Sequence, residues 1–296
     1  MSELHPVRGA GLGLRRALLG PLSSLTAADV DFMEVAPENW IRVGGRFGRQ
    51  LREYSERFPL LCHGLSLSIG SPAELDWELL KSIKAFMKTH QVPCYSEHLS
   101  YCSDNGHLYD LMPIPFTDAS ARYVADRIRQ VQDFLECKIA IENVSYYAAP
   151  QQEMSEIEFL NIVLEEADTN LLLDVNNIYV NSVNHGYDAE EFLQKIPTHR
   201  VAYGHIAGHF VEAEDLLVDT HGAKVVDPVW QLLEKAYQHV GNFPTLLERD
   251  FNFPPVPELL IEVEAIKKWQ ASAPQNNLRL RENYDLNRNI DVSEPA

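Results

Sequence analysis

Short apolar runs recur along this chain, and most of them stop at a histidine or a carboxylate. Residues 171–173 are three consecutive leucines, typical of a strand buried on both faces, and the run ends at Asp174. Five further runs end in the same way, at His63, Glu97-His98, Glu142-Asn143, His205 and Glu248-Arg249-Asp250. Because helices cover both faces of sheets built from such strands, the recurrence favours an α/β fold.

Two more strands and a series of helical segments complete the pattern. We predict strands at 9–14 and 31–35, which makes roughly eight in all. The helices are expected at 46–57, from Ser71 through Met87, at 117–135, after Ser155, from Asp188 to near Pro197, from Asp227 and at 256–269. Alternation of this kind predicts a (β/α)8 TIM barrel. A doubly wound open sheet is the main alternative, but the glycines of 9–14 do not complete its nucleotide-binding fingerprint.

Length and composition bound the organisation of the chain. Its 296 residues suit one barrel of roughly 250 residues. We expect one metal-binding barrel domain over residues 1–271 and a polar tail over 272–296, either disordered or in contact with a partner. The net charge of −18 argues against nucleic acid, which requires Lys and Arg for its phosphates.

The four cysteines, Cys62, Cys94, Cys102 and Cys137, form no C-x-x-C pair. This usage, the lack of a signal-peptide pattern and the lack of a run long enough to cross a bilayer predict a cytoplasmic protein that does not bind membranes.

The strand ends carry the residue types that bind metal ions. In a barrel the ends of all strands converge on one mouth, so the six residues there should meet: His63, His98, Glu142, Asp174, His205 and Glu248. Asp219 and His221 add an acid and an imidazole spaced to face one ion, and His209 is a weaker candidate. So many ligands favour two or three ions over one, and their types suit iron, manganese or zinc. Surface histidines such as His90, His199 and His239, and the loop residues Glu38 and Asn39, are expected to be structural.

At these residues the chain resembles the multinuclear non-haem iron-dependent oxidative enzymes, the family that contains the iron subunit of methanobactin biosynthesis. The resemblance covers about residues 8–270 and rests on seven ordered motifs. They are His63-Gly-Leu-Ser-Leu-Ser, Ser96-Glu97-His98-Leu, Ile141-Glu142-Asn143, Asp174-Val-Asn176-Asn177, Gly204-His205-Ile-Ala-Gly-His209, Asp219-Thr-His221-Gly and Leu247-Glu248-Arg249-Asp250.

The resemblance implies a xylose-isomerase-like TIM barrel that binds two or three iron ions of mixed valence. The ligands it implies are His63, His98, Glu142, Asp174, His205, Asp219, His221 and Glu248, while Asn176 and His209 match motif positions without an assigned role. Among these we expect Glu142, Asp174 and His205 to be catalytic. Relatives use dioxygen to oxidise cysteine or other residues of ribosomally synthesised peptides, usually with a second protein that binds the peptide's leader. A peptide substrate and a leader-binding partner are therefore implied here.

Two other functions fit the residues themselves. Metal-dependent sugar isomerases and hydrolases, endonucleases among them, also place Glu, Asp and His at the strand ends of this barrel, although a nuclease requires a basic groove that the net charge disfavours. A metal-binding protein without catalysis would have a coordinatively saturated site and no open pocket.

Overall fold

Eight parallel strands close into a barrel in this computed structural model, which describes residues 4–104 and 106–273. Around the barrel the strand order is β1-β12-β9-β8-β7-β4-β3-β2, and every neighbouring pair is parallel. The strands are β1 Ala10–Gly13, β2 Phe32–Val35, β3 Leu60–His63, β4 Tyr95–His98, β7 Ala140–Glu142, β8 Asn170–Asp174, β9 Val201–Ile206 and β12 Thr245–Leu247. The predicted TIM barrel is confirmed.

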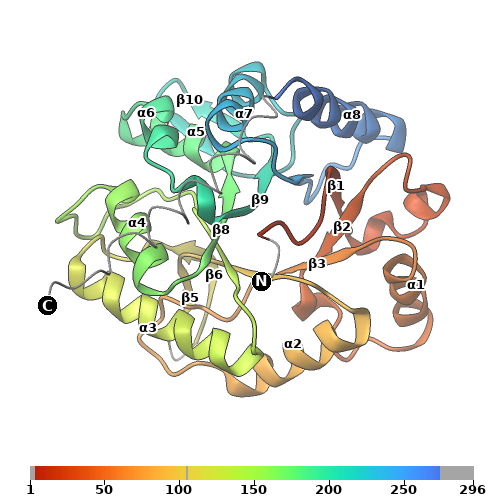
Figure 1. Ribbon diagram of the computed structural model, residues 1–296, viewed down its shortest axis with the longest axis horizontal. Helices are drawn as coiled ribbons and strands as arrows, with labels where there is room; N and C mark the ends of the chain where they lie inside the picture. Colours follow the sequence, from red (N-terminus) through yellow and green to blue (C-terminus); the bar gives the residue numbers. More distant parts are fainter. Residues whose placement is uncertain (1–3, 105, 274–296) are drawn as a thin grey trace, which may run out of the picture.

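Helices form a ring outside the barrel (Figure 1). They are α1 Gly45–Ser55, α2 Trp77–His90, α3 Asp118–Leu135, α4 Glu156–Glu166, α5 Val175–His185, α6 Ala189–Gln194, α7 Asp227–Val240 and α8 Val256–Ser272. Short 3-10 helices lie at Arg16–Leu18, Pro21–Ser24, Pro37–Asn39 and Thr198–Arg200. The large apolar core lies between this ring and the barrel. Within the described residues, no helix is both long and apolar enough to cross a bilayer.

Alternation along each strand builds two layers inside the barrel. A lower apolar layer includes Phe32, Leu61, Ala140, Leu172 and Leu246, which pack together. Successive side chains of a strand point to opposite faces, so the residue two positions after each of these faces the interior again, nearer the strand's C-terminal end. Those positions hold Glu34, His63, Glu142, Asp174 and Glu248. The barrel therefore carries a polar layer directly above an apolar one.

Close packing explains the glycines of the first strand. A Cβ atom on Gly11 would lie 2.5 Å from the ring of Phe32, so only glycine lets that ring fill the lower layer. The segment is a strand, as expected, and not a nucleotide-binding loop. Cys62 and Cys94 are also buried core residues, and burial raises the pKa of the Cys94 thiol to about 12 and that of Cys62 well above its ordinary value.

Two helices differ from the prediction. Helix α2 starts at Trp77 and not near Ser71, because Asp76 caps it by accepting a bond from the amide of Leu79. The Ser71 hydroxyl instead donates to the Ser103 carbonyl at 2.6 Å and fixes the preceding loop. Helix α5 was not predicted. Its asparagines have low helix propensity, and they serve as polar contacts to neighbouring loops.

Two hairpins that the sequence did not predict stand beyond the barrel strands. β5 Tyr101–Ser103 and β6 His107–Met112 follow β4, whereas β10 Phe210–Ala213 and β11 Leu216–Val218 follow β9. Asn184 of α5 holds the second hairpin through two bonds: its amide nitrogen donates to the Leu217 carbonyl at 2.9 Å, and its oxygen accepts from the Leu217 amide at 2.7 Å.

Candidate metal centre

The six predicted strand-end residues meet at the C-terminal mouth of the barrel. His63, Glu142, Asp174, His205 and Glu248 are all buried, and His98 is partly exposed. Asp174 is both the last residue of β8 and the N-cap of α5, because its carboxylate accepts the amide of Asn177 at 2.6 Å. This direct strand-to-helix junction leaves the other carboxylate oxygen, Oδ2, free to face the mouth.

One end of the site is formed by two histidines and one carboxylate. The Nε2 atoms of His63 and His98 are 3.1 Å apart, and they lie 3.2 and 3.3 Å from Oε2 of Glu142. The Nδ1 atom of His63 is paired with the Ser96 hydroxyl at 2.7 Å, which fixes the ring and leaves Nε2 for the site. Three potential ligand atoms therefore converge on one point.

His205 lies at the centre of the site. Its Nδ1 atom is 3.4 Å from Oε1 of Glu142, 3.1 Å from Oε2 of Glu248 and 4.0 Å from Oδ2 of Asp174. The two oxygens of Glu142 thus face different histidines, which is the geometry of a bridging carboxylate. The Nε2 atom on the far side of the ring lies 3.1 Å from Glu34.

The other end of the site comes from the loops after β11 and β12. His221 Nδ1 lies 3.4 Å from Glu248 and 3.2 Å from Asp250, while its Nε2 is 2.7 Å from Oδ1 of Asp219. His221 has a φ of 51°, a left-handed conformation that non-glycine residues adopt at a cost of about 1–3 kcal/mol. The fold therefore holds His221 in an unfavourable backbone conformation in which its imidazole faces Asp219, Glu248 and Asp250.

Buried charges strongly perturb the titration of these groups. Burial opposes the imidazolium of His98, but Glu142 and Glu97 outweigh it and raise the pKa to about 9. Burial also opposes charge on His205 and His221, and neighbouring carboxylates nevertheless raise both pKa values well above the ordinary range. Burial and the charge of Glu142 raise the pKa of Asp174. So many buried carboxylates in one site require compensating positive charge.

The unsatisfied atoms test whether these residues suit metal ions. Buried atoms without a hydrogen bond include Oε2 of Glu142, Oδ2 of Asp174, Nδ1 of His205, Nε2 of His221 and Nδ1 of His98. Three of them lie within 3.4 Å of another ligand-type atom of the site without hydrogen-bond alignment, as ligands of a common cation do: Oε2 of Glu142 near His63, Nδ1 of His205 near Glu142 and Nε2 of His221 near Asp219. Three groups have ligand atoms close enough to share an ion: His63-Glu142-His205, Glu142-Asp174-His205-Glu248 and His221-Glu248-Asp250. The donor set fits metal ions.

Two residues of this centre were not predicted from the sequence. Glu34 shares the spacing of the other interior acids, because it stands two positions after the buried Phe32, and that spacing is the signal that finds it. Asp250 stands two positions after Glu248. It lies beyond the end of β12, where the alternation of a strand no longer predicts which way a side chain points.

Other candidates lie beside the centre or away from it. His209 Nδ1 pairs with the Asn176 amide oxygen at 2.8 Å, and Asn176 donates to Asp219 at 2.9 Å, so both reach the site only through Asp219. Glu38 accepts the loop amides of Leu65 and Ser66. His90 bonds Ser55, His239 lies against a carbonyl, and His199 lies in a 3-10 helix, none of them among the potential metal groups.

Fold and site together define a TIM barrel whose mouth is lined by potential metal ligands. Solved structures share this fold at low sequence identity. The apo 3-keto-D-glucoside 4-epimerase YcjR from E. coli matches with a TM-score of 0.57 and 13% identity, covering 88% of this chain and 99% of that one. Endonuclease IV from Thermus thermophilus matches with a TM-score of 0.56 and 14% identity, covering 90% and 100%. These likenesses establish the xylose-isomerase-like fold alone.

The chain belongs to the family of RiPP precursor modification enzymes MbnB/TglH/ChrH, whose model matches residues 9–271. A UPF0276 protein of Shewanella sediminis is 60% identical over 274 residues, which cover 93% of this chain and 98% of that protein. A UPF0276 protein of Alcanivorax borkumensis is 60% identical over 279 residues, covering 91% and 93%. The family confirms the resemblance found from the motifs, and it implies a peptide substrate.

Proposed function

We propose that this protein is an iron-dependent oxidase that uses dioxygen to modify cysteine residues of a ribosomally synthesised peptide. The observation that carries the proposal is the continuous series of ligand atoms from His63 and His98 through Glu142, His205 and Glu248 to His221. A single ion does not reach from one end of this series to the other. The arrangement supports two or three neighbouring ions, as oxidation by dioxygen at a metal pair requires.

Each residue has a distinct role in this proposal. His63, His98, Glu142, Asp174, His205, Asp219, His221 and Glu248 are the ligands, and Asp250 is added to them. Iron held there supplies a Lewis acid for a cysteine thiolate and a redox centre for dioxygen. Glu142 and Glu248, which each face at least two histidines, would provide carboxylate oxygens between the two ends of the centre, and Asp174 would contribute its unpaired Oδ2.

The surroundings of the mouth suit a peptide better than a sugar. Large apolar side chains are exposed on the loops and hairpins that follow the barrel strands, among them Leu65, Met112, Tyr147, Phe210 and Phe251. Exposed apolar surface is available to macromolecular ligands. The two hairpins that carry Met112 and Phe210 extend beyond the barrel strands on either side of β7 and β8. A second protein that binds the peptide's leader is part of the proposal.

Mass spectrometry of the peptide product tests the proposal. The protein is co-expressed, with iron, with each short cysteine-containing reading frame that neighbours its gene. We expect a change of mass confined to cysteine, dependent on dioxygen and abolished in Glu142→Ala. An unchanged peptide together with epimerisation of a free ketose would contradict the proposal and favour a sugar epimerase.

A further inference from the structure

A second hollow lies outside the barrel, between α1 and α2. Its cavity has a volume of about 480 Å³. The two helices make few direct contacts along their lengths, and the loop of residues 40–45 covers the end of the gap nearest the mouth. Gly44, Gly45 and Gly48 line one wall, so no side chains from these positions fill the space. The result is an open groove on the outer surface, separate from the metal-binding residues.

Three arginines without carboxylate partners line this groove. Arg42, Arg49 and Arg52 are exposed, and among the described residues none of them forms an ion pair. Among the other arginines of the described chain, Arg122 is paired with Asp118 and Arg200 with Glu165, whereas others, such as Arg46 and Arg57, also form no ion pair. In a protein of net charge −18, the distinguishing feature of the groove is that three unpaired arginines line the same cavity.

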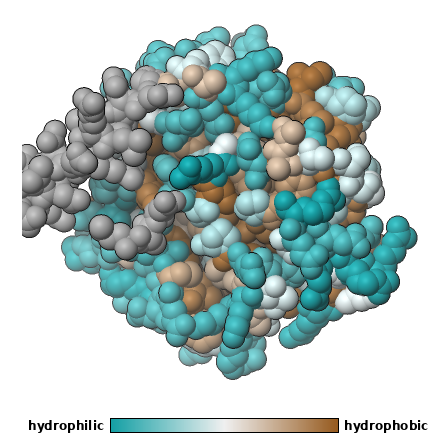
Figure 2. Space-filling model, turned by 45° about the vertical axis from the view of Figure 1, so that its right-hand side comes forward, coloured by the Kyte–Doolittle hydropathy of each residue, from teal (hydrophilic) through white to brown (hydrophobic). Residues whose placement is uncertain are grey.

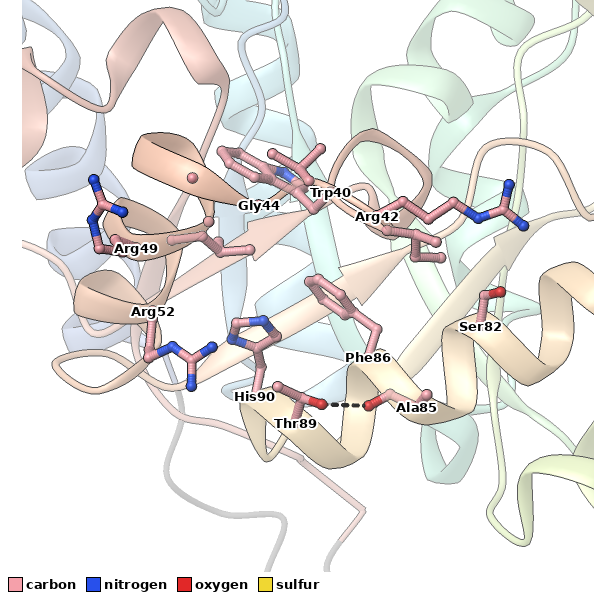
Figure 3. A pocket seen from close by; sticks show the side chains of 15 residues that line it. Trp40, Arg42, Gly44, Arg49, Arg52, Ser82, Ala85, Phe86, Thr89 and His90 are labelled. Atoms are coloured by element: carbon pink, nitrogen blue, oxygen red, sulfur yellow. Dashed lines mark hydrogen bonds between the residues drawn. The ribbon is translucent and has the colours of Figure 1, made fainter.

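The arginines point along the groove and not at one centre. Figure 3 shows Arg42 and Arg49 extending toward opposite sides, while Arg52 lies beside His90. One phosphate or one carboxylate would require guanidinium groups that converge on it. Charges distributed along a groove suit an extended ligand with several carboxylates.

The floor of the groove is apolar. Trp40 and Phe86 lie on opposite sides of it, with Phe86 packed against His90 at a ring-centroid distance of 4.5 Å (Figure 3). The right-hand side of Figure 1, where α1 lies, comes forward in Figure 2, and on that face apolar surface is visible between hydrophilic regions. A bulky apolar side chain between two acidic ones would contact this floor while its neighbours reach the arginines.

We propose that the groove between α1 and α2 binds an acidic peptide segment that carries at least one large apolar side chain. The segment lies extended along the groove, its carboxylates face Arg42, Arg49 and Arg52, and its apolar side chain packs between Trp40 and Phe86. The net negative charge of the rest of the protein disfavours acidic ligands everywhere else, which gives the groove its selectivity. The proposal is independent of the chemistry at the mouth.

Selection from a displayed library of random short peptides, panned against the full-length protein, tests this proposal. A selected peptide is then labelled with fluorescein and its affinity measured by anisotropy. The test variant is Arg49→Glu/Arg52→Glu. The matched control is Arg46→Glu/Lys88→Glu, which changes the net charge equally at exposed positions of α1 and α2 that do not line the groove.

We expect enrichment of peptides rich in Asp and Glu with an interspersed Leu, Phe or Trp. The test variant should bind them at least about tenfold more weakly, the control should bind them normally, and binding should weaken as salt rises. Enrichment of basic or uncharged peptides, equal binding by the test variant, or no enrichment at all would overturn the proposal.

Discussion

Glu34 on β2 and His205 on β9 meet inside the barrel, with Oε2 of the acid 3.1 Å from Nε2 of the imidazole. The same oxygen also accepts the hydroxyl of Tyr203 at 2.8 Å, so Glu34 is held in place by a second residue. A carboxylate that accepts a hydrogen bond from Nε2 leaves Nδ1 as the nitrogen that can bind a metal ion in place of its proton, and Nδ1 is the atom that faces Glu142 and Glu248. Glu34 therefore sets the tautomer of the central histidine.

Replacing Glu34 should loosen the metal centre without removing a ligand. We expect Glu34→Gln to lower metal affinity by about 10–100-fold, because the neutral amide is a weaker acceptor than the carboxylate and orients His205 less firmly. Metal content after a graded chelator challenge measures the effect. Glu156→Gln is the control, since it makes the same change in a partly buried glutamate outside the potential metal groups. Equal metal retention by the two variants would contradict this role.

The two ends of the site should lose metal separately. His221 and Asp219 belong to the end of the site formed by the loops after β11 and β12, called the outer end below. Glu142, in contrast, faces both His63 and His205. We therefore expect His221→Ala to lower the metal content by about one ion per chain and Glu142→Ala to lower it further. Elemental analysis of the purified variants tests this difference. Identical losses from both substitutions would argue against a centre with distinct ends.

Glu156 should make stability depend on pH. Oε2 of Glu156 is buried without a hydrogen bond, and burial raises the pKa of the group from 4.5 to about 7. The folded state therefore binds this proton more tightly than the unfolded state. The resulting stabilisation is complete below pH 4.5 and is lost as the pH rises through 7. Over that interval the loss is at most about 3 kcal/mol.

Glu156→Gln should remove this dependence. Urea unfolding of the metal-free proteins at about pH 5 and about pH 8 compares the two free energies of unfolding on either side of the raised pKa. We expect the variant to gain stability relative to the original chain at the higher pH, with a smaller difference at the lower one. Parallel pH profiles for the two proteins would show that the carboxyl does not titrate as the structure indicates.

The β10–β11 hairpin should depend on one side chain of α5. Asn184→Ala removes both bonds to Leu217 and leaves two backbone groups without these partners, at a local cost of about 1–3 kcal/mol. Amide hydrogen exchange should accelerate in β10 and β11 and remain unchanged in the β5–β6 hairpin, which serves as the internal control. An unchanged exchange rate at the Leu217 amide would contradict the role of Asn184 in stabilising the hairpin.

The barrel was predictable because most of its strands are recognisable in the sequence as short apolar runs. Runs such as 171–173 are too apolar and too short for anything but buried strands, and glycine packing against Phe32 explains the first one. Helix α5 escaped prediction because its asparagines favour caps and loops in isolation. The contacts that stabilise them, such as Asn184 to Leu217, join segments far apart in the sequence.

Site residues could be predicted from the sequence where the alternation of side chains along a strand determines which of them point into the barrel. His63, Glu142 and Asp174 end their strands facing inward, so the mouth they share follows from the barrel itself. The outer end does not follow from periodicity. Asp219 and His221 lie on an irregular loop with a left-handed residue, and only their close spacing and the family motif indicated them. The pairing of Glu34 with His205 depends on the closure of the barrel, which places β2 within reach of β9.

Metal analysis of anaerobically purified protein, combined with Mössbauer spectroscopy, tests the central claim most directly. We predict at least two iron ions per chain, with ferrous and ferric signals together, and loss of both signals in His205→Ala. Stoichiometric zinc or manganese with no iron, even after expression in iron-supplemented medium, would contradict the proposed oxidase and favour a metal-dependent isomerase or hydrolase.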